Sequence, residues 1–516
     1  MGKIFFRLVL GGIAGKILGL LREVLLAALF GAGRVVAANR IALTATLIPI
    51  NFFTADALTA GFLPLYVQYR QERPAMARTL YRAVHLLLAV FSLLLTVALI
   101  FGRDLWVGLL GPGLDSHTAD IAAAMLGIAA LGVPFYVLYN LNTLVGLAND
   151  DVRLINLRPS CQSVGLIVAT VIAWRTGHVS VLAWGFTVPY IVLWGWGAYW
   201  IRRQGYLHGG NDTGSHRLDR AATKVALGMF WRRLRPLLLI PVILQGSIAA
   251  ERAVGSLLGV EVVAATEYAR FVVDSCMALL AAPLGLAGLA SFARMKADEV
   301  GAGLRRLIPP VILVAVPLAL ILSLNSRGIV TLLYARGQFD ERAVDVSSVL
   351  LLGFALGIWA HVLGYTFVKV LNARGANFQV AIVMALSFGI PIAVNLLLYK
   401  QWGAFTIGAA SSIGGVLMFL ISARWLSVLG YSTRLLAIAL PGAAVAAVAG
   451  YLLAGAGLLR LVASCVAILL IWTGYVTAVP SLRRTFLSFV LKKPGRSTDE
   501  PQPDGLVATK SATGEQ

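Results

Sequence analysis

The amino-acid sequence predicts an all-α, polytopic membrane protein with about fourteen transmembrane helices. Of its 516 residues, 59% are hydrophobic and only 13% are charged, and the mean hydropathy is +0.83. The apolar residues fall in repeated blocks of about 20, the length that crosses a hydrocarbon core about 30 Å thick. The two halves of the chain also share a pattern. A soluble chain could not bury this much apolar side chain, which excludes a water-soluble enzyme.

The apolar blocks define the expected spans and their grouping. We expect spans at 4–30, 38–68, 80–102, 118–147, 155–174, 179–201, 234–258, 262–293, 304–325, 344–371, 377–399, 404–426, 435–455 and 458–479. They form a first six-helix lobe (1–203), a cytoplasmic basic linker (204–233), a second six-helix lobe (234–430) and two additional spans (431–482). The polar, Pro-containing residues 483–516 read as a disordered cytoplasmic tail.

A repeat at a shift of about 225 residues supports the two lobes. Leu131 and Gly132 match Leu356 and Gly357, and the loop 105–115 corresponds to 328–340. At a shift of 224, Arg70 and Arg82 match Arg294 and Arg306. A shift of six spans preserves orientation, so the repeat axis runs along the membrane normal. Repeats of this kind build two-lobed transporters with a substrate cavity between the lobes.

The distribution of basic residues predicts the orientation. The formal net charge is +20, and Lys and Arg concentrate at the N-terminus and in alternate loops, which all lie on one side if the spans are counted correctly. Cytoplasmic loops collect positive charge, so both termini are expected in the cytoplasm. This loop bias explains the charge without nucleic acid as a partner. Cys161, Cys276 and Cys465 lie far apart in apolar stretches, which gives no metal spacing and no disulfide framework.

Ionisable side chains inside the spans are the candidate functional residues, because each costs several kcal/mol in hydrocarbon and usually faces a cavity. The first span holds Lys16, Arg22 and Glu23. Lys16 lies near the midplane, and Lys16 and Glu23, seven residues apart, share a helix face. Two interpretations stay open: side chains that face a cavity, or a structural ion pair within the bundle.

Three further spans carry charges. In the second span, Asp56 is expected to pair with a base of the first span or of the other lobe, and Arg40 is expected at the membrane interface. The seventh span holds Glu251 and Arg252. In the eighth, the spacing of Glu267, Arg270 and Asp274 suits a salt-bridge ladder along one helix. This ladder and a cavity-facing role for Arg270 are both open.

Absent motifs narrow the function classes. The sequence contains no G-x-x-x-x-G-K-[ST] motif, so no P-loop ATPase is expected. No His, Asp and Glu cluster recurs at a spacing suited to metal or hydrolytic chemistry, and no loop is long enough for a catalytic domain. We therefore expect a transporter with neither cofactor nor metal, and not an enzyme.

Four segments carry a family resemblance. KILGLLREVLLAALFGAG (16–33) resembles the first helix of MurJ/MviN-type lipid flippases, a family of the multidrug/oligosaccharidyl-lipid/polysaccharide (MOP) exporter superfamily. ALTAGFLPLYVQY (57–69), APLGLAGLA (282–290) and IVTLLYARGQFD (329–340) extend the resemblance. It implies a multi-pass protein of the bacterial inner membrane that moves undecaprenyl-pyrophosphate-linked saccharides, such as the peptidoglycan precursor lipid II, by alternating access.

The resemblance also implies roles for individual residues. Lys16, Arg22 and Arg270 fall on basic positions of a cationic cavity that receives the pyrophosphate. The remaining charges would form a supporting network; these are Glu23, Asp56, Glu251, Arg252 and Asp274. The membrane lipid is the other expected partner, and the sequence names no coupling ion.

This chain departs from the lipid II flippase pattern at several positions. Ala37 or a neighbour stands where those flippases have an Asp, Ile50 and Asn51 replace an Arg pair, and Lys16 replaces an Arg. These differences favour a different lipid-linked saccharide, such as an exopolysaccharide or O-antigen repeat unit. The alternatives are a cation-coupled multidrug exporter of the same superfamily and a membrane-embedded polysaccharide polymerase or ligase.

Overall fold

The structure is a computed structural model that describes residues 2–54, 56–207, 220–235, 238–292, 297–455 and 457–483, and in these ranges it holds helices and no strand. The predicted tail lies outside them from residue 484 on. The helices of the first half are α1 (Gly2–Phe30), α2 (Arg34–Thr54), α3 (Asp56–Glu72), α4 (Pro74–Phe101), α5 (Arg103–Leu110), α6 (Ser116–Ala130), α7 (Val133–Leu147), α8 (Arg153–Thr176) and α9 (Val181–Arg203).

The second half repeats this alternation of long and short helices. After α10 (Arg220–Leu234) come α11 (Leu239–Leu258), α12 (Val260–Phe292), α13 (Ala297–Leu324), α14 (Ser326–Tyr334), α15 (Glu341–Ala355), α16 (Ile358–Ala373), α17 (Asn377–Trp402), α18 (Phe405–Trp425), α19 (Leu429–Leu453) and α20 (Leu458–Ala478). Every predicted span overlaps one helix or one pair of consecutive helices.

The helices have the length and composition of membrane spans. Within the described ranges, nine helices are long and apolar enough to cross a membrane, or up to 11 segments if each of two bent pairs counts as one span. The other three predicted spans coincide with α1, α11 and α12, which carry the charges of the candidate site. The observed segments are consistent with the predicted fourteen.

One segment, the linker, differs from the expected pattern. The predicted span 38–68 covers α2 and α3, which lie on either side of residue 55, a residue outside the described ranges. The predicted linker contains α10, which packs on α3 and α4. Ala226, Phe230 and Leu234 form a buried stripe on α10 at helical spacing, so this basic segment has an apolar face directed at the first lobe.

The internal repeat is visible in local geometry. The pair α6 and α7 is bent by 46°, and the pair α15 and α16 is bent by 47°. The bends fall at Gly132 and Gly357, which the sequence alignment equates. A Cβ on Gly132 would lie 3.0 Å from the Phe186 ring, and one on Gly357 would collide with Ser412. Close packing against α9 and α18 therefore favours glycine at the two bends.

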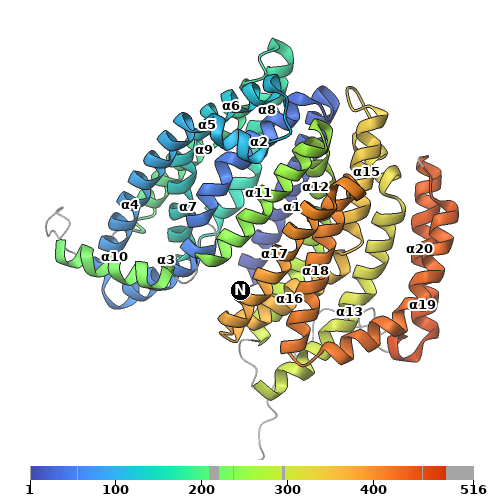
Figure 1. Ribbon diagram of the computed structural model, residues 1–516. Coiled ribbons are helices and arrows are strands. Elements are labelled where there is room, and N and C mark those ends of the chain that lie inside the picture. Colours follow the sequence, from blue (N-terminus) through green and yellow to red (C-terminus); the bar gives the residue numbers. More distant parts are fainter. Residues whose placement is uncertain are drawn as a thin grey trace, which may run out of the picture.

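The two halves form two groups of helices that meet along α1, α2, α11 and α12 (Figure 1). α1 packs along α8, where a Cβ on Gly15 would lie 2.8 Å from the Pro159 side chain. α2 crosses to contact both α11 and α12. The last two helices, α19 and α20, pack on α13 at the far edge of the second group, where Trp472 Nε1 donates to the Leu313 carbonyl at 2.9 Å.

Candidate functional site

Glu23 is the centre of a buried charge group on α1 and α2. Arg22 Nε donates to Glu23 Oε1 at 3.0 Å, and Arg40 Nη2 donates to Glu23 Oε2. Glu23 is only 2% exposed. The expected interfacial position of Arg40 is wrong: this residue is 8% exposed. α2 begins at Arg34 rather than at residue 38, so Arg40 lies more than one turn inside the helix.

Lys16 lies on the same helix but outside this ion pair. Its side chain is half-buried, and Nζ lies 5.8 Å from the centroid of the Phe271 ring on α12. Glu23, which shares its helix face, is held by the two arginines instead. Lys16 has no ion-pair partner among the described residues, and the Asp274 carboxylate of α12 attracts it across the boundary between the two halves.

A second charge group joins α11 to α12. Arg270 Nη2 donates to Glu251 Oε2, and Arg252 Nη2 donates to Glu267 Oε1. Glu267 and Arg270 therefore form their hydrogen bonds to α11 rather than along α12, and of the predicted ladder only the electrostatic attraction between Arg270 and Asp274 is present. A pair along one helix contributes only about 0.2–0.5 kcal/mol, whereas a pair between packed helices compensates two charges that are both partly buried.

The second group also reaches the first half of the chain. Arg252 is 6% exposed, and its Nε donates to Thr44 Oγ1 of α2 at 3.2 Å. Asp274, one turn beyond Arg270, is exposed and makes no ion pair to the described residues. The side chain of Asp56 lies outside the described residues, so its predicted pairing has no counterpart here.

The two charge groups face each other across the junction of the halves. The Arg40 guanidinium carbon lies 5.8 Å from the centroid of the Tyr268 ring on α12. A Cβ on Gly19 would lie 3.2 Å from the Phe271 ring. The structure thus gathers the predicted charges of α1, α11 and α12 at one junction, where Lys16, Arg22 and Arg40 leave an excess of positive charge beside Glu23.

Beyond these charges, the end of α1 is locked to the loop between α14 and α15, a contact we call the Gln338 latch. The Gln338 backbone N–H donates to the Ala28 carbonyl at 2.9 Å. Gly31 and Gly337 have φ angles of +62° and +63°, the left-handed region in which glycine is unstrained. A Cβ on Gly337 would collide with the Ala28 carbonyl. Both glycines are needed for this close approach.

A corresponding contact joins the loop between α5 and α6 to the end of α11, which we call the Gly113 latch. The Gly113 N–H donates to Ser256 Oγ at 3.1 Å, and a Cβ on Gly113 would collide with the Ser256 backbone. Gly113 precedes Gln338 by 225 residues, and Gly31 precedes Ser256 by the same number. The two latches are therefore equivalent under the repeat, and each ties one half of the chain to the other.

Comparisons with known proteins place this fold among the two-lobed membrane transporters. The structure superposes with a TM-score of 0.79 and 17% identity on one described as "Lipid II flippase MurJ, inward closed conformation", covering 94% of this chain and 100% of that chain. An inward-facing multidrug resistance MATE transporter of the MOP superfamily gives a TM-score of 0.63 at 13% identity, covering 81% of this chain and 96% of that one.

The sequence assigns the family. A family model described as "Lipid II flippase MurJ" matches residues 26–474, and the chain belongs to this family. It is 27% identical over 438 residues to a probable lipid II flippase MurJ of Synechocystis sp., which covers 78% of this chain and 77% of the relative. A probable lipid II flippase MurJ of Rhizobium meliloti is 26% identical over 431 residues, covering 78% and 76%.

Sequence reasoning missed two members of the junction. Arg40 was placed at an interface because the predicted second span began too late. Tyr268 was not considered, yet its hydroxyl donates to the Gly31 carbonyl at 3.0 Å and so connects α12 to the end of α1. A charge six residues inside a helix is a signal that could have identified Arg40. No local signal identifies Tyr268, because an aromatic ring in an apolar helix is ordinary core composition.

Proposed function

We propose that this chain moves an undecaprenyl-pyrophosphate-linked saccharide across the bacterial inner membrane by alternating access, without making or breaking covalent bonds. Membership of a lipid flippase family supports the transport of a lipid-linked saccharide. The positive excess at the junction of the two halves is the observation that carries the choice of an anionic headgroup. Lipid II is the substrate named for the family, and the departures at Ala37, Ile50 and Asn51 favour a different saccharide on the same carrier.

The pyrophosphate would bind at Lys16, Arg22 and Arg270. A diphosphate cannot enter hydrocarbon unaided, because removing water from its charges is prohibitively costly. Lys16 offers a cation with no ion-pair partner among the described residues, and only the electrostatic attraction of Asp274 competes for it. The guanidinium groups of Arg22 and Arg270 are held by Glu23 and Glu251, and phosphate oxygens have the same hydrogen-bonding geometry as carboxylate oxygens. A headgroup could therefore replace these acids as partner.

The latches support an alternating mechanism. Gly31 lies 15 residues beyond Lys16, which is about 22 Å along α1. The Gln338 and Gly113 latches therefore join the halves at one end of the bundle, far from Lys16, and Tyr268 connects the Gln338 latch to the Arg40 side of the charge groups. With both termini in the cytoplasm, as the basic loops predict, this end faces the periplasm. Breaking both latches would open the junction to that side.

The polyprenyl tail has an apolar path outside the junction. A groove of about 380 Å³ lies between α13 and α20, lined by Leu313, Pro317, Leu469 and Trp472 among others. A second groove of about 380 Å³ lies where α19 meets α13 and α15. Both are lined almost entirely by apolar side chains, so an isoprenoid chain would lose nothing by leaving the lipid for them.

The decisive experiment reconstitutes the full chain in proteoliposomes with an undecaprenyl-pyrophosphate-linked disaccharide. The appearance of the sugar at the opposite face is measured with an impermeant lectin. Lys16→Ala, Arg22→Ala and Arg270→Ala should each slow transfer by about tenfold or more, because each removes a charge-assisted contact worth about 1.5–3 kcal/mol. Arg175→Ala is the matched control, since Arg175 lies in the last turn of α8 with an exposed side chain.

Two outcomes would decide against the proposal. If all three variants transfer the disaccharide at the wild-type rate, the pyrophosphate does not bind at these residues. If the protein instead accumulates ethidium in the same vesicles, the chain is a cation exporter like the MATE proteins whose fold it shares. The positive excess at the junction argues against that alternative, because it repels an organic cation.

A further inference from the structure

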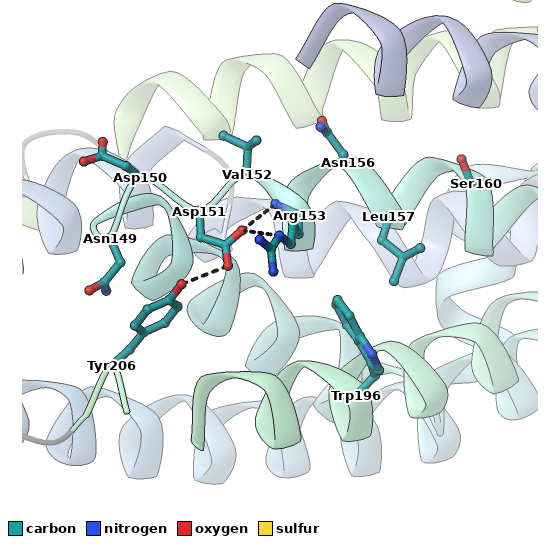
Figure 2. A pocket seen from close by; sticks show the side chains of 10 residues that line it. All are labelled: Asn149, Asp150, Asp151, Val152, Arg153, Asn156, Leu157, Ser160, Trp196 and Tyr206. Atoms are coloured by element: carbon teal, nitrogen blue, oxygen red, sulfur yellow. Dashed lines mark hydrogen bonds and ion pairs between the residues drawn. The ribbon is translucent and has the colours of Figure 1, made fainter. Parts of the chain in front are cut away.

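A polar cavity lies in the first half of the molecule, at the turn where α7 ends and α8 begins (Figure 2). Its volume is about 650 Å³, within the range of about 300–1,000 Å³ typical of small-molecule sites. It is lined by the 149–153 turn, the first two turns of α8, Trp196 of α9 and Tyr206. Lys16, Arg22 and Arg270 are not among its lining residues, so it is separate from the junction site.

The walls of this cavity are fixed by Asp151. Its carboxylate accepts hydrogen bonds from Trp200 Nε1 and from the Tyr206 hydroxyl, each at 2.9 Å, and from the Arg153 backbone N–H at 3.0 Å. These bonds tie the turn to α9 and to the segment that follows it, as Figure 2 shows for Tyr206 and Arg153. The cavity is therefore preformed, and Asp151 is occupied in holding it.

Other groups face the cavity without a partner. The carboxylate of Asp150 and the hydroxyl of Ser160 make no hydrogen bond or ion pair to any residue in the described ranges. The Trp196 ring stacks on Trp200, with centroids 5.5 Å apart and planes at 16°. In Figure 2 it projects from α9 toward Leu157 of α8. The lining of the cavity thus combines an oriented aromatic ring with an acceptor at one end and a hydroxyl at the other.

Trp196 differs from the two exposed large aromatic residues of its helix. Aromatic rings gather at membrane interfaces as anchors, and Trp184 and Tyr199 fit that role because they are 41% and 56% exposed. Trp196 is less exposed and lines the cavity. A ring that served only as an anchor would face lipid rather than a polar space between two helices.

The charges at the cavity select the class of ligand. Asp150 and Asp151 outnumber Arg153, so a phosphate group would meet repulsion from the carboxylates. A neutral saccharide can bind both to the carboxylates and to the aromatic ring of Trp196. Its hydroxyls donate to carboxylates in charge-assisted hydrogen bonds, and its C–H face packs against an aromatic ring, which supplies apolar area with a defined geometry.

We propose that this cavity binds the saccharide of the substrate headgroup before it enters the junction between the halves. The sugar stacks on Trp196 and hydrogen-bonds to Asp150 and Ser160. With the termini in the cytoplasm, the cavity lies on the cytoplasmic side, where the lipid-linked saccharide is loaded. This inference rests on the proposed function, because that function makes the headgroup a saccharide.

The test measures binding rather than transport. Saturation-transfer NMR is recorded on the purified full chain in detergent with N,N′-diacetylchitobiose as the probe, and with inorganic pyrophosphate as competitor. The disaccharide should bind the wild type, and Trp196→Ala should weaken it about fivefold to tenfold through loss of the stacking surface. Trp184→Ala is the control, because it removes an exposed ring from the same helix. Pyrophosphate should not compete.

Asp150→Asn keeps the test decisive if Trp196→Ala fails to fold. Asp150 has φ +56°, a conformation that asparagine also tolerates, and the amide removes the charged acceptor. The inference is overturned if the wild type does not bind the disaccharide, if neither variant weakens binding, or if pyrophosphate displaces the sugar. The proposed function would still be supported if the wild type transfers the lipid-linked disaccharide in proteoliposomes and Arg22→Ala does not. A different result would separate the two proposals in the other direction. If Arg22→Ala does not slow transfer but Trp196→Ala still weakens disaccharide binding, the pyrophosphate site is rejected and the saccharide cavity is retained.

Discussion

At the level of single residues, carboxylates neutralise most of the arginine charge inside this protein. Glu23 holds Arg22, its neighbour in sequence, and Arg40, 17 residues away on another helix. Glu251 and Glu267 each hold an arginine of the facing helix. Uncompensated charge in a membrane is costly, and these acids limit it to a small positive excess. The same arrangement leaves arginines that can exchange a protein carboxylate for a substrate phosphate.

The Asp151 carboxylate, which lies outside the membrane spans, makes a pH-dependent contribution to the stability of the folded protein. Burial raises its pKa, but hydrogen bonds from Trp200, the Arg153 backbone and Tyr206 outweigh burial and hold the pKa below the ordinary value of 3.8. Because the folded pKa is depressed, the stabilisation is complete above pH 3.8 and is lost as pH falls through the folded pKa.

We therefore expect Asp151→Asn to destabilise the protein at neutral pH. The difference in unfolding temperature between wild type and variant should shrink as the pH is lowered below about 3.8. Thermal unfolding of the purified chain from pH 3 to pH 7 measures this difference, and Asp150→Asn, at the exposed neighbour, serves as control. A difference that does not change with pH would mean that Asp151 acts through shape rather than charge.

At the scale of elements, the ends of helices determine how the halves meet. α1 ends at Phe30 and α11 at Leu258, and each end receives a loop from the other half through a latch. Asp115 and Asp340, which are equivalent in the repeat, each cap the following helix by accepting from a backbone N–H. The caps fix where α6 and α15 begin and so fix the position of the latch loops.

The Gln338 latch predicts a specific effect of a single methyl group. Gly337→Ala should loosen the latch, because the new Cβ would collide with the Ala28 carbonyl. The reporter is Ala32→Cys beside the latch, 5% exposed in this structure, in a chain whose three native cysteines are replaced by serine. Its reaction with a membrane-impermeant maleimide should accelerate by about tenfold, if loosening shifts the equilibrium by about 1.4 kcal/mol.

Gly177→Ala is the matched control for this measurement. Gly177 also has a positive φ, +74°, but a Cβ there would meet nothing within 4 Å. It therefore carries the same backbone strain without the collision. Equal acceleration in both variants would show that strain alone, rather than opening of the latch, exposes the reporter.

At the scale of the whole molecule, two repeated halves surround a charged junction, and an apolar pair of helices flanks the second half. This division separates the two parts of an amphipathic substrate. The charged headgroup is matched by cations between the halves, while the grooves along α13 present apolar surface for a hydrocarbon chain. The fold thus offers each part of a lipid-linked saccharide an environment of its own polarity.

The groove between α13 and α20 yields a prediction with a built-in control. Leu469 lines this groove, and its neighbour Leu470, 68% exposed, does not. Both substitutions to lysine put a charge at the same depth of the same helix, with a similar cost of insertion. Leu469→Lys should slow transfer of an undecaprenyl substrate in proteoliposomes by about tenfold, whereas Leu470→Lys should not. Equal rates in the two variants would exclude the groove as the path of the tail.

Local patterns along the chain are sufficient to predict the class of protein, the repeat and the spans that carry charge. Hydropathy and the cost of burying a charge are local properties, so Lys16, Arg22 and Arg270 stood out without any structure. The alignment of the two halves equates Gly132 with Gly357, but the bends at these glycines are visible only in the structure. Family resemblance in the first helix came from the same local pattern.

The pairing of the charges and the contacts between the halves depend on how distant helices pack against one another. Arg40 meets Glu23, and Arg270 meets Glu251 rather than Asp274, because an ion pair between helices depends on their rotation and distance. The helical period of 3.6 residues fixes which residues share a face, but not which helix that face meets. The latches and the cavity beside Trp196 likewise form between segments that are far apart in sequence, so no local sequence pattern predicts them.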